Sequence, residues 1–360
     1  MKTFSYIILL SLFLFSCKEN VVKKTETASE AMQIATPEIS EVTSFKGQQV
    51  TGISVTHEGR IFVNFPRWRT GVTNSVVEVL SATTNTPFPN KEWNSWEIGA
   101  KIEANKFVGV QSVVAFEDLL YVLDTRSPLF KAVVDAPRVF VFNINTKKLE
   151  HTYIFSEGSY HSNSYINDLR IDKKNNRIYF TDSGNSGLVI LERTTGTFTR
   201  ILDDHKSTAA ALDYLTFANG KWTNTVNSDG IALDDKNDKL YYHALSGYNL
   251  YSIPTNALLL EDELEIEKAV NFETKTSAPD GMIFDKNGIL YFADLEHNKI
   301  MYRKPDNSIQ TLIKGDAIKW ADTFSIYNNY LYFTNSRINE VTADISDMVF
   351  TVNKIALPNN

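Results

Sequence analysis

A β-hairpin pattern that occurs six times along the chain constrains the fold more than any other feature of the sequence. Each copy begins with a polar residue, commonly followed by Gly, and continues with an apolar strand, a polar turn and a second strand that starts with an aliphatic and an aromatic residue. Successive copies begin between 42 and 61 residues apart. Such self-similarity indicates a repeat architecture. The first residues of the six copies are Thr51, Gln111, Asp168, Asp229, Asp280 and Asp322.

The spacing of the copies is what a four-stranded antiparallel sheet with its loops requires. Two further strand pairs, within residues 138–155 and 187–202, supply outer strands. We therefore predict an all-β fold, a six-bladed β-propeller with four antiparallel strands per blade, in which neighbouring blades bury each other's faces. The last strand, within residues 348–357, is expected to close the ring by pairing with strands from the N-terminal side. Residues 255–270 alone show helical periodicity and predict a short helical insertion, capped at Thr255 or Asn256.

The first 45 residues lie outside the predicted propeller. Lys2 and the apolar run at 6–15 are typical of a signal peptide, and the run is too short to span a bilayer. The run ends in Leu-Phe-Ser-Cys, which resembles a bacterial lipobox with Cys17 as the lipidated residue. We predict a lipoprotein signal peptide at 1–16, a lipidated Cys and tether at 17–45, and a propeller at 46–360. An ordinary cleaved signal with a chance Cys is the alternative.

This interpretation predicts a location in the bacterial cell envelope, facing the periplasm or the cell surface, with the lipid anchor as the protein's contact with the membrane. Cys17 is the single cysteine, so the mature domain has no internal disulfide. A net charge of -7 without a basic block argues against a nucleic-acid partner. The histidines lack zinc-site spacing, and the sequence has no nucleophile elbow or nucleotide-binding motif.

Several segments together resemble the major royal jelly protein/Yellow family. The first is VTGISVTHEGRIFVNFPRW, and the others lie at 110–126, 137–149, 165–184 and 228–251. The resemblance covers nearly everything after residue 46 and implies a secreted or exported six-bladed propeller. Its insect members include pigmentation proteins linked to dopachrome conversion and salivary proteins that bind biogenic amines. It therefore implies that a small polar or aromatic ligand, such as an aromatic amine or a catechol, is bound or isomerised at the central channel.

Three triplets, NDL at Asn167, SDG at Ser228 and PDG at Pro279, resemble the gluconolactonase/senescence-marker propellers. That resemblance implies a divalent cation, with Ca²⁺ the best fit to oxygen ligands, held by Asn167, Asp229 and Asp280. Asp229 and Asp280 are then the candidate catalytic residues of a lactonase-like hydrolase. The chain departs from that family at Thr51, where the lactonases have Glu.

The innermost strands of a propeller line its axis, so the residues at their starts are expected to converge. Four of these residues, Asp168, Asp229, Asp280 and Asp322, are acids and cannot all stay ionised without a counter-charge. A metal ion, a cationic ligand, a basic side chain or proton uptake would balance them. The alternative is ordinary turn chemistry, in which Asp before Gly recurs because each blade has the same turn.

Arg67 and Trp68 end the first hairpin and complete the predicted site. A guanidinium near the acids would neutralise them, and an indole would stack on an aromatic ligand. Packing between blades is the alternative for Trp68. The predicted ligand-binding set is Asn167, Asp168, Asp229, Asp280, Asp322, Arg67 and Trp68. The sequence leaves open whether the protein is a gluconolactonase-like hydrolase, a dopachrome-tautomerase-like isomerase or a cell-surface interaction module without chemistry.

Overall fold

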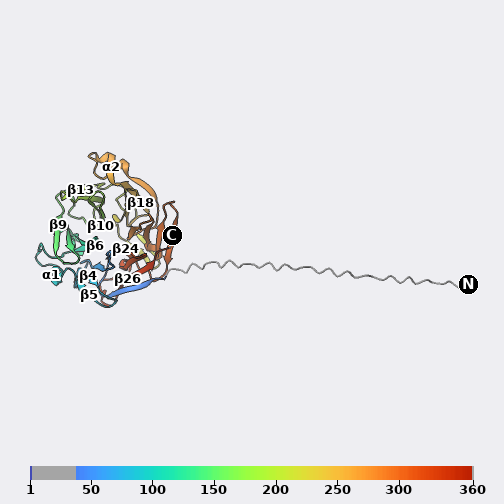
Figure 1. Cartoon of the computed structure of the whole chain (residues 1–360), viewed down its shortest axis with the longest axis horizontal. Helices are drawn as coiled ribbons and strands as arrows, with labels where there is room; N and C mark the ends of the chain where they lie inside the picture. Colours follow the sequence, from blue (N-terminus) through green and yellow to red (C-terminus); the bar gives the residue numbers. More distant parts are fainter. Residues whose placement is uncertain (2–37, 359–360) are drawn as a thin grey trace. The chain divides into compact units, whose positions relative to one another are not determined.

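Six antiparallel sheets of four strands each surround a central channel in the computed structural model, which describes residue 1 and residues 38–358 (Figure 1). The predicted six-bladed β-propeller is confirmed. The first three blades consist of β2 (Gly52–Val55), β3 (Ile61–Asn64), β4 (Val76–Val79), β5 (Asn85–Pro87); β6 (Val110–Phe116), β7 (Leu119–Asp124), β8 (Arg138–Asn143), β9 (Leu149–Ile154); and β10 (Ile166–Asp172), β11 (Arg177–Asp182), β12 (Gly187–Glu192), β13 (Thr197–Ile201). The last three consist of β16 (Ser228–Asp234), β17 (Lys239–Ala244), β18 (Asn249–Pro254), β19 (Asn271–Lys275); β20 (Met282–Phe284), β21 (Leu290–Asp294), β22 (Lys299–Arg303), β23 (Ile309–Lys314); and β24 (Ala321–Tyr327), β25 (Tyr330–Asn335), β26 (Val349–Ala356), β1 (Ser40–Lys46).

Each blade begins at the channel and ends at the rim. In Figure 1 the strands β6, β10 and β24 lie near the centre of the ring, whereas β5, β9 and β13 lie at its edge. The outer strands that the sequence predicts within 138–155 and 187–202 are the pairs β8–β9 and β12–β13. The start of each innermost strand therefore faces the same end of the channel.

The N-terminal strand closes the ring, as predicted. β1 runs antiparallel to β26, with Phe45 opposite Phe350, and forms the outer strand of the sixth blade. The predicted boundary at residue 46 is therefore too late, because residues 40–45 already belong to the blade. Thr43 and Phe45 alternate inward along β1 and are buried, which is the pattern of a strand with one covered face. Cys17 and the predicted signal peptide lie outside the described residues.

The predicted helical insertion lies between β18 and β19 but is shorter than 255–270. Its helix is α2 (Glu263–Ala269), and the side chain of Asp262, not of Thr255 or Asn256, accepts the capping hydrogen bond from the Leu264 N–H. Thr255–Ala257 forms a separate 3₁₀ turn. α2 projects from the rim in Figure 1, away from the channel. The described chain also contains α1 (Lys91–Asn94), the two-stranded hairpin β14 (Leu215–Phe217) and β15 (Gly220–Trp222), and further 3₁₀ turns at Pro128–Phe130, Leu295–His297 and Ile338–Glu340.

Packing between neighbouring blades explains the aliphatic–aromatic pair that starts each second strand. Tyr179 of β11 and Leu240 of β17, which belong to the third and fourth of these pairs, are fully buried in one apolar cluster that joins the third and fourth blades. Because both faces of these strands are covered, consecutive residues along them are buried rather than alternate ones. Among residues 38–358, no helix has the length and apolar character needed to cross a membrane.

Candidate functional site

A β-bulge interrupts the first ladder of four blades at the same place, the start of the innermost strand. The pairing shifts between Val110 and Ser112, between Ile166 and Leu169, between Ser228 and Ile231, and between Ala321 and Phe324. A bulge leaves its extra residues outside the ladder and re-aims their side chains. The residues released in this way are Gln111, Asn167, Asp168, Asp229, Gly230, Asp322 and Thr323. In these four blades Gln111, Asn167, Asp229 and Asp322, the first residue of each bulge, line the same cavity at the channel.

The register corrects the sequence alignment of the third blade by one residue. Ile166 pairs with Asp182 before that bulge, and Ser228 pairs with Ala244 before the equivalent bulge in the fourth blade. The structural counterpart of Asp229 is therefore Asn167, not Asp168. A one-residue slip along a strand sends a side chain to the opposite side. Asp168 accordingly does not line the cavity that contains the other acids.

A cavity of about 620 Å³ lies where the innermost strands start. Five predicted residues line it: Asn167, Asp229, Asp280, Asp322 and Trp68. This volume falls within the range typical of small-molecule sites. The structure therefore brings together residues that lie up to 254 positions apart, from Trp68 to Asp322.

A chain of hydrogen bonds runs from Trp68 to Asp229, and each donor points toward the acid. Trp68 Nε1 donates to the Tyr165 hydroxyl at 2.5 Å, and Tyr165 donates to Gln111 Oε1 at 2.7 Å. Gln111 Nε2 donates to Asn167 Oδ1 at 3.0 Å, and Asn167 Nδ2 donates to Asp229 Oδ2 at 2.8 Å. Burial raises the pKa of Tyr165, which keeps its hydroxyl protonated as a donor. The network holds these side chains in one arrangement.

The three cavity acids sit where ionisation is costly. Burial raises the pKa of Asp322 to about 7, and the nearby Asp168 carboxylate adds to the effect. Burial, followed by repulsion from Asp322, also raises the pKa values of Asp229 and Asp280 well above the usual range of an aspartic acid. Three carboxyl groups in one enclosed site are poorly solvated and repel one another when ionised, so they do not all remain charged. At neutral pH the cavity therefore offers carboxyl groups that can donate as well as accept hydrogen bonds.

Aromatic side chains form the walls above these acids. Trp320 Nε1 donates to Asp280 Oδ2 at 2.7 Å, and the Trp320 ring meets the Trp222 ring edge-on at 4.9 Å between centroids. Trp68 stacks on Phe130 at 4.8 Å. Trp222 comes from β15, so the extra hairpin between the third and fourth blades supplies part of the wall. Flat apolar walls with a few polar groups are typical of sites for planar ligands.

A second cavity, of about 410 Å³, occupies the opposite end of the innermost strands. Asp168 lines it together with Arg170, whose Nη1 donates to Asp168 Oδ2 at 2.7 Å. Arg170 Nη2 also donates to the Met282 carbonyl at 2.8 Å, and this bond joins the third blade to the fifth across the channel. Asp168 therefore has its own cationic partner and lines a different cavity from the other acids, although its carboxylate is close enough to raise their pKa values.

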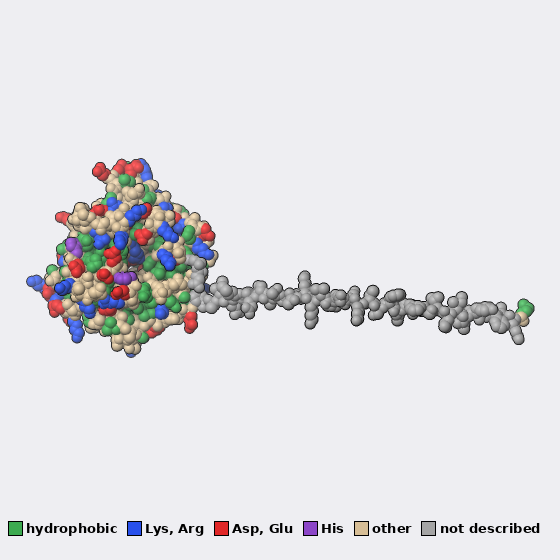
Figure 2. Space-filling view, viewed as in Figure 1, with side chains coloured by type: hydrophobic (Ala, Val, Ile, Leu, Met, Phe, Trp, Pro, Cys, Tyr) green, Lys and Arg blue, Asp and Glu red, His purple; other side chains and the backbone are tan. Residues whose placement is uncertain are grey.

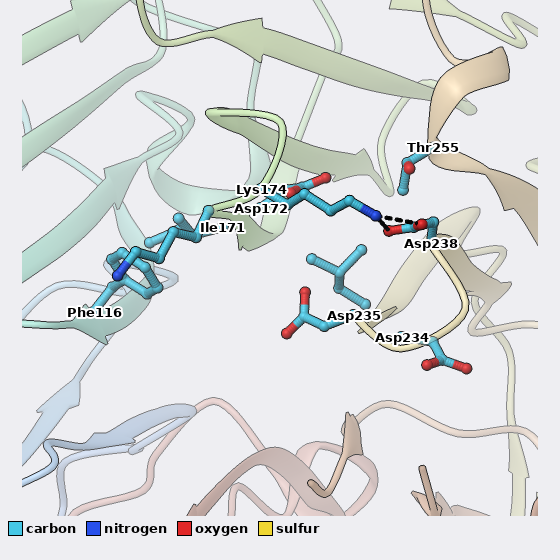
Figure 3. Close-up of a pocket in the computed structure, with 10 residues that line it drawn as sticks. Phe116, Ile171, Asp172, Lys174, Asp234, Asp235, Asp238 and Thr255 are labelled. Atoms are coloured by element: carbon cyan, nitrogen blue, oxygen red, sulfur yellow. Dashed lines mark hydrogen bonds and ion pairs between the residues drawn. The ribbon is translucent and has the colours of Figure 1, made fainter.

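A further acidic groove, of about 270 Å³, lies between the inner hairpin turns of the third and fourth blades (Figure 3). Asp172 and Asp234 accept hydrogen bonds from the Asn residues three positions later in their turns, and Lys174 pairs with Asp238. These carboxylates stabilise the turns. The face of the propeller in Figure 2 intermingles acidic and basic side chains around a central hollow.

Arg67 does not face the cavity acids. It is buried, and its guanidinium donates to the carbonyls of Phe107 and Asn94, both at 2.8 Å, and to the Ser75 hydroxyl. Arg67 thus anchors loops of the first blade. The arginine that lines the cavity is Arg69, two residues later. The sequence interpretation missed Arg69, Tyr165 and Trp320, although PRWR carries two arginines and Trp320 directly precedes the sixth repeat.

The predicted metal ligands, Asn167, Asp229 and Asp280, would have to direct oxygen atoms at one point to coordinate a divalent cation. Both ends of the Asn167 amide are engaged, and its N–H rather than its oxygen faces Asp229. Thr51, at the position of the lactonase Glu, accepts a hydrogen bond from Asn64. Within residues 38–358, no group of three or more His, Cys, Asp or Glu side chains is placed to hold a metal ion. This arrangement does not fit a metal centre.

Solved structures with the same fold include a streptogramin B lyase and a luciferin-regenerating enzyme. The lyase is 12% identical, with a TM-score of 0.52 over 89% of this chain and 98% of that chain. The luciferin-regenerating enzyme is also 12% identical, with a TM-score of 0.57 over 89% of this chain and 95% of that chain. At this identity the similarity shows the propeller fold alone.

Two relatives from Apis mellifera are similar in sequence. Major royal jelly protein 3 is 25% identical over 264 residues, which are 63% of this chain and 46% of the relative. Major royal jelly protein 7 is 23% identical over 239 residues, which are 62% of this chain and 52% of the relative. The chain thus spans about half the length of these relatives. The family model described as "Major royal jelly protein" matches residues 110–357. Because this match covers more than half of the chain, the protein belongs to the major royal jelly protein family.

Proposed function

We propose that this protein binds a small polar or aromatic molecule in the cavity at the start of the innermost strands. The observation that carries the proposal is the composition of that one cavity, in which the buried Asp229 and Asp322 and the half-buried Asp280 lie with the indoles of Trp68, Trp222 and Trp320. An aromatic amine or a catechol would place its ring against the indoles and its ammonium or hydroxyl groups against the acids.

The same acids are candidates for proton transfer if the bound ligand is isomerised. A carboxyl group whose pKa is raised toward neutrality can both give and take a proton near neutral pH. Asp229, Asp280 and Asp322 meet this condition because burial raises the pKa of each. The proposal therefore has two parts: the cavity binds the ligand, and its acids can in addition catalyse isomerisation of the bound ligand.

Replacing Asp280 by Asn is expected to weaken the binding of a cationic aromatic amine roughly ten-fold, because a charge-assisted hydrogen bond contributes about 1.5–3 kcal/mol. The Asn oxygen can still accept the Trp320 N–H, so the cavity wall is preserved. Isothermal titration with a panel of amines and catechols measures the effect. Asp235→Asn, at the opposite end of the channel, removes the same charge and should leave affinity unchanged. Absence of binding by the wild type at millimolar concentration would end the proposal.

We further propose that the protein is exported and anchored by a lipid on Cys17, as the lipobox-like sequence predicts. Cys17→Ala, or inhibition of the lipoprotein signal peptidase with globomycin, should move the protein from the membrane fraction of a bacterial host to the soluble fraction. Cell fractionation followed by immunoblotting measures the shift. Ser16→Ala keeps a small residue before the Cys and serves as the control. A Cys17→Ala protein that stays with the membrane would contradict the anchor.

A further inference from the structure

Arg69 is a cation without an anionic partner at the edge of the ligand cavity. It lines both the 620 Å³ cavity and an adjoining hollow of about 400 Å³ formed with residues 47–49 and 343–346. Within residues 38–358, no carboxylate acts on the pKa of its guanidinium, and its buried Nη1 has no hydrogen-bond acceptor. Burial lowers the pKa of Arg69. Arg69 is half-buried, but an N–H group that is buried without an acceptor, as at its Nη1, is costly to maintain unless something binds it.

Gln49 lies, like Arg69, where the two hollows adjoin, and it offers a hydrogen-bond acceptor. It lines both hollows, is only 7% exposed, and donates from Nε2 to the Ser336 carbonyl at 2.8 Å. That bond fixes the orientation of the amide, because the reverse orientation would place two oxygens against each other. The remaining oxygen, Gln49 Oε1, is buried and has no donor among the described residues. The edge of the cavity therefore holds one unmatched donor and one unmatched acceptor.

We propose that the ligand of this cavity is an aromatic compound of the amino-acid type, whose carboxylate binds Arg69 and whose neighbouring N–H group binds Gln49 Oε1. This inference rests on the proposed function and narrows it, since simple aromatic amines lack the carboxylate. In an α-amino acid the carboxylate, which accepts hydrogen bonds, and the ammonium group, which donates them, are attached to the same carbon. These two groups complement the unpaired N–H of Arg69 and the unpaired oxygen of Gln49. Planar, two-point recognition of carboxylates is the characteristic use of Arg. The ring would then lie against the indoles, above the acids.

The test compares three pairs of ligands that differ in the carboxylate: phenylalanine with phenethylamine, tyrosine with tyramine, and tryptophan with tryptamine. Isothermal titration of the full chain is expected to show tighter binding of the amino acid in at least one pair. Arg69→Met is expected to weaken amino-acid binding roughly ten- to a hundred-fold, the equivalent of one charge-assisted contact, and to weaken amine binding far less. Arg69→Lys should retain part of the preference.

Lys101→Met is the matched control, because it removes an exposed positive charge that does not line the cavity. Thermal unfolding shows whether each variant is folded; Arg69→Met leaves no partner unsatisfied, so its midpoint should stay near that of the wild type. Amines that bind as tightly as amino acids, or an Arg69→Met variant that weakens both equally, would overturn this inference while the proposed binding function stands. Failure of all six compounds to bind, together with the amine and catechol panel, would overturn both.

Discussion

Replacing Gly281 by Ala is expected to lower the free energy of unfolding by about 3 kcal/mol, the upper part of the range for overpacked sites. A Cβ at this position would lie 2.6 Å from the Asp322 carbonyl oxygen and 3.1 Å from Phe324 Cδ1. The carbonyl belongs to the backbone of the next blade, so the clash cannot be relieved by rotating a side chain. Urea denaturation of the variant and the wild type measures the loss.

Gly315→Ala provides the control for this prediction. A Cβ at Gly315 would meet nothing within 4 Å, and the residue is not in the left-handed region, so Ala should be neutral or slightly stabilising there. Gly230→Ala should behave like Gly281→Ala, because its Cβ would lie 2.9 Å from the Asp280 carbonyl oxygen. Equal urea midpoints for Gly281→Ala and Gly315→Ala would show that the blades can separate without cost.

Close packing between blades explains why Gly follows Asp in these repeats. The alternative proposed from the sequence was a turn that recurs in every blade. Neither Gly230 nor Gly281 adopts the left-handed conformation that a Gly-dependent turn requires. Instead, each Gly lies where the carbonyl of the following blade approaches the innermost strand. The Asp precedes the point of closest approach and projects into the channel. The repeated Gly therefore sets the spacing between blades, and the repeated Asp serves the cavity.

Replacing Asp322 by Asn is expected to raise the free energy of unfolding at pH 8 by roughly 4 kcal/mol and to change it little at pH 4. Burial raises the pKa of Asp322 from 3.8 to about 7 in the folded protein. Each unit of difference from the unfolded value corresponds to about 1.4 kcal/mol. Asn is neutral and similar in shape, so it removes the cost of burying the charge without opening a cavity.

The sign of the effect follows from proton binding. Below about pH 4 the carboxyl is protonated in both the folded and unfolded states, so the wild type carries no penalty. Between about pH 4 and 7 the unfolded chain loses this proton while the folded one retains it, and folding becomes progressively less favourable. Above about pH 7 both states are ionised and the penalty is constant. The advantage of Asp322→Asn should therefore grow from pH 4 to pH 7 and then level off.

Urea denaturation at pH 4, 6 and 8 distinguishes this outcome from a general charge effect. Asp316→Asn, which removes an exposed carboxylate from the turn between β23 and β24, is the control for the loss of one acidic group. An Asp322→Asn variant with the same stability change at all three pH values would contradict the burial of an ionisable group at the channel.

The sequence alone determined the number of blades, the four-stranded composition of each and the closure of the ring. These features follow from hydrophobic alternation and from the repeat spacing, which are local properties that a single chain displays directly. The expectation that equivalent positions in a ring converge also identified Asp229, Asp280 and Asp322 as neighbours, but it named Asp168 as the fourth member, and Asp168 lines the other cavity. Asn167, which takes that place, was predicted only from the triplet resemblance.

The tertiary structure alone decided which way individual side chains point. The bulge in the third blade sends Asn167 to the cavity and Asp168 to Arg170 at the other end, and repeat spacing does not record a bulge. Arg67 and Arg69 are equally basic in sequence, but backbone carbonyls far along the chain bind the first and leave the second without a partner. Their roles depend on which segments elsewhere in the chain pack against each side chain, and the sequence of PRWR does not record those contacts.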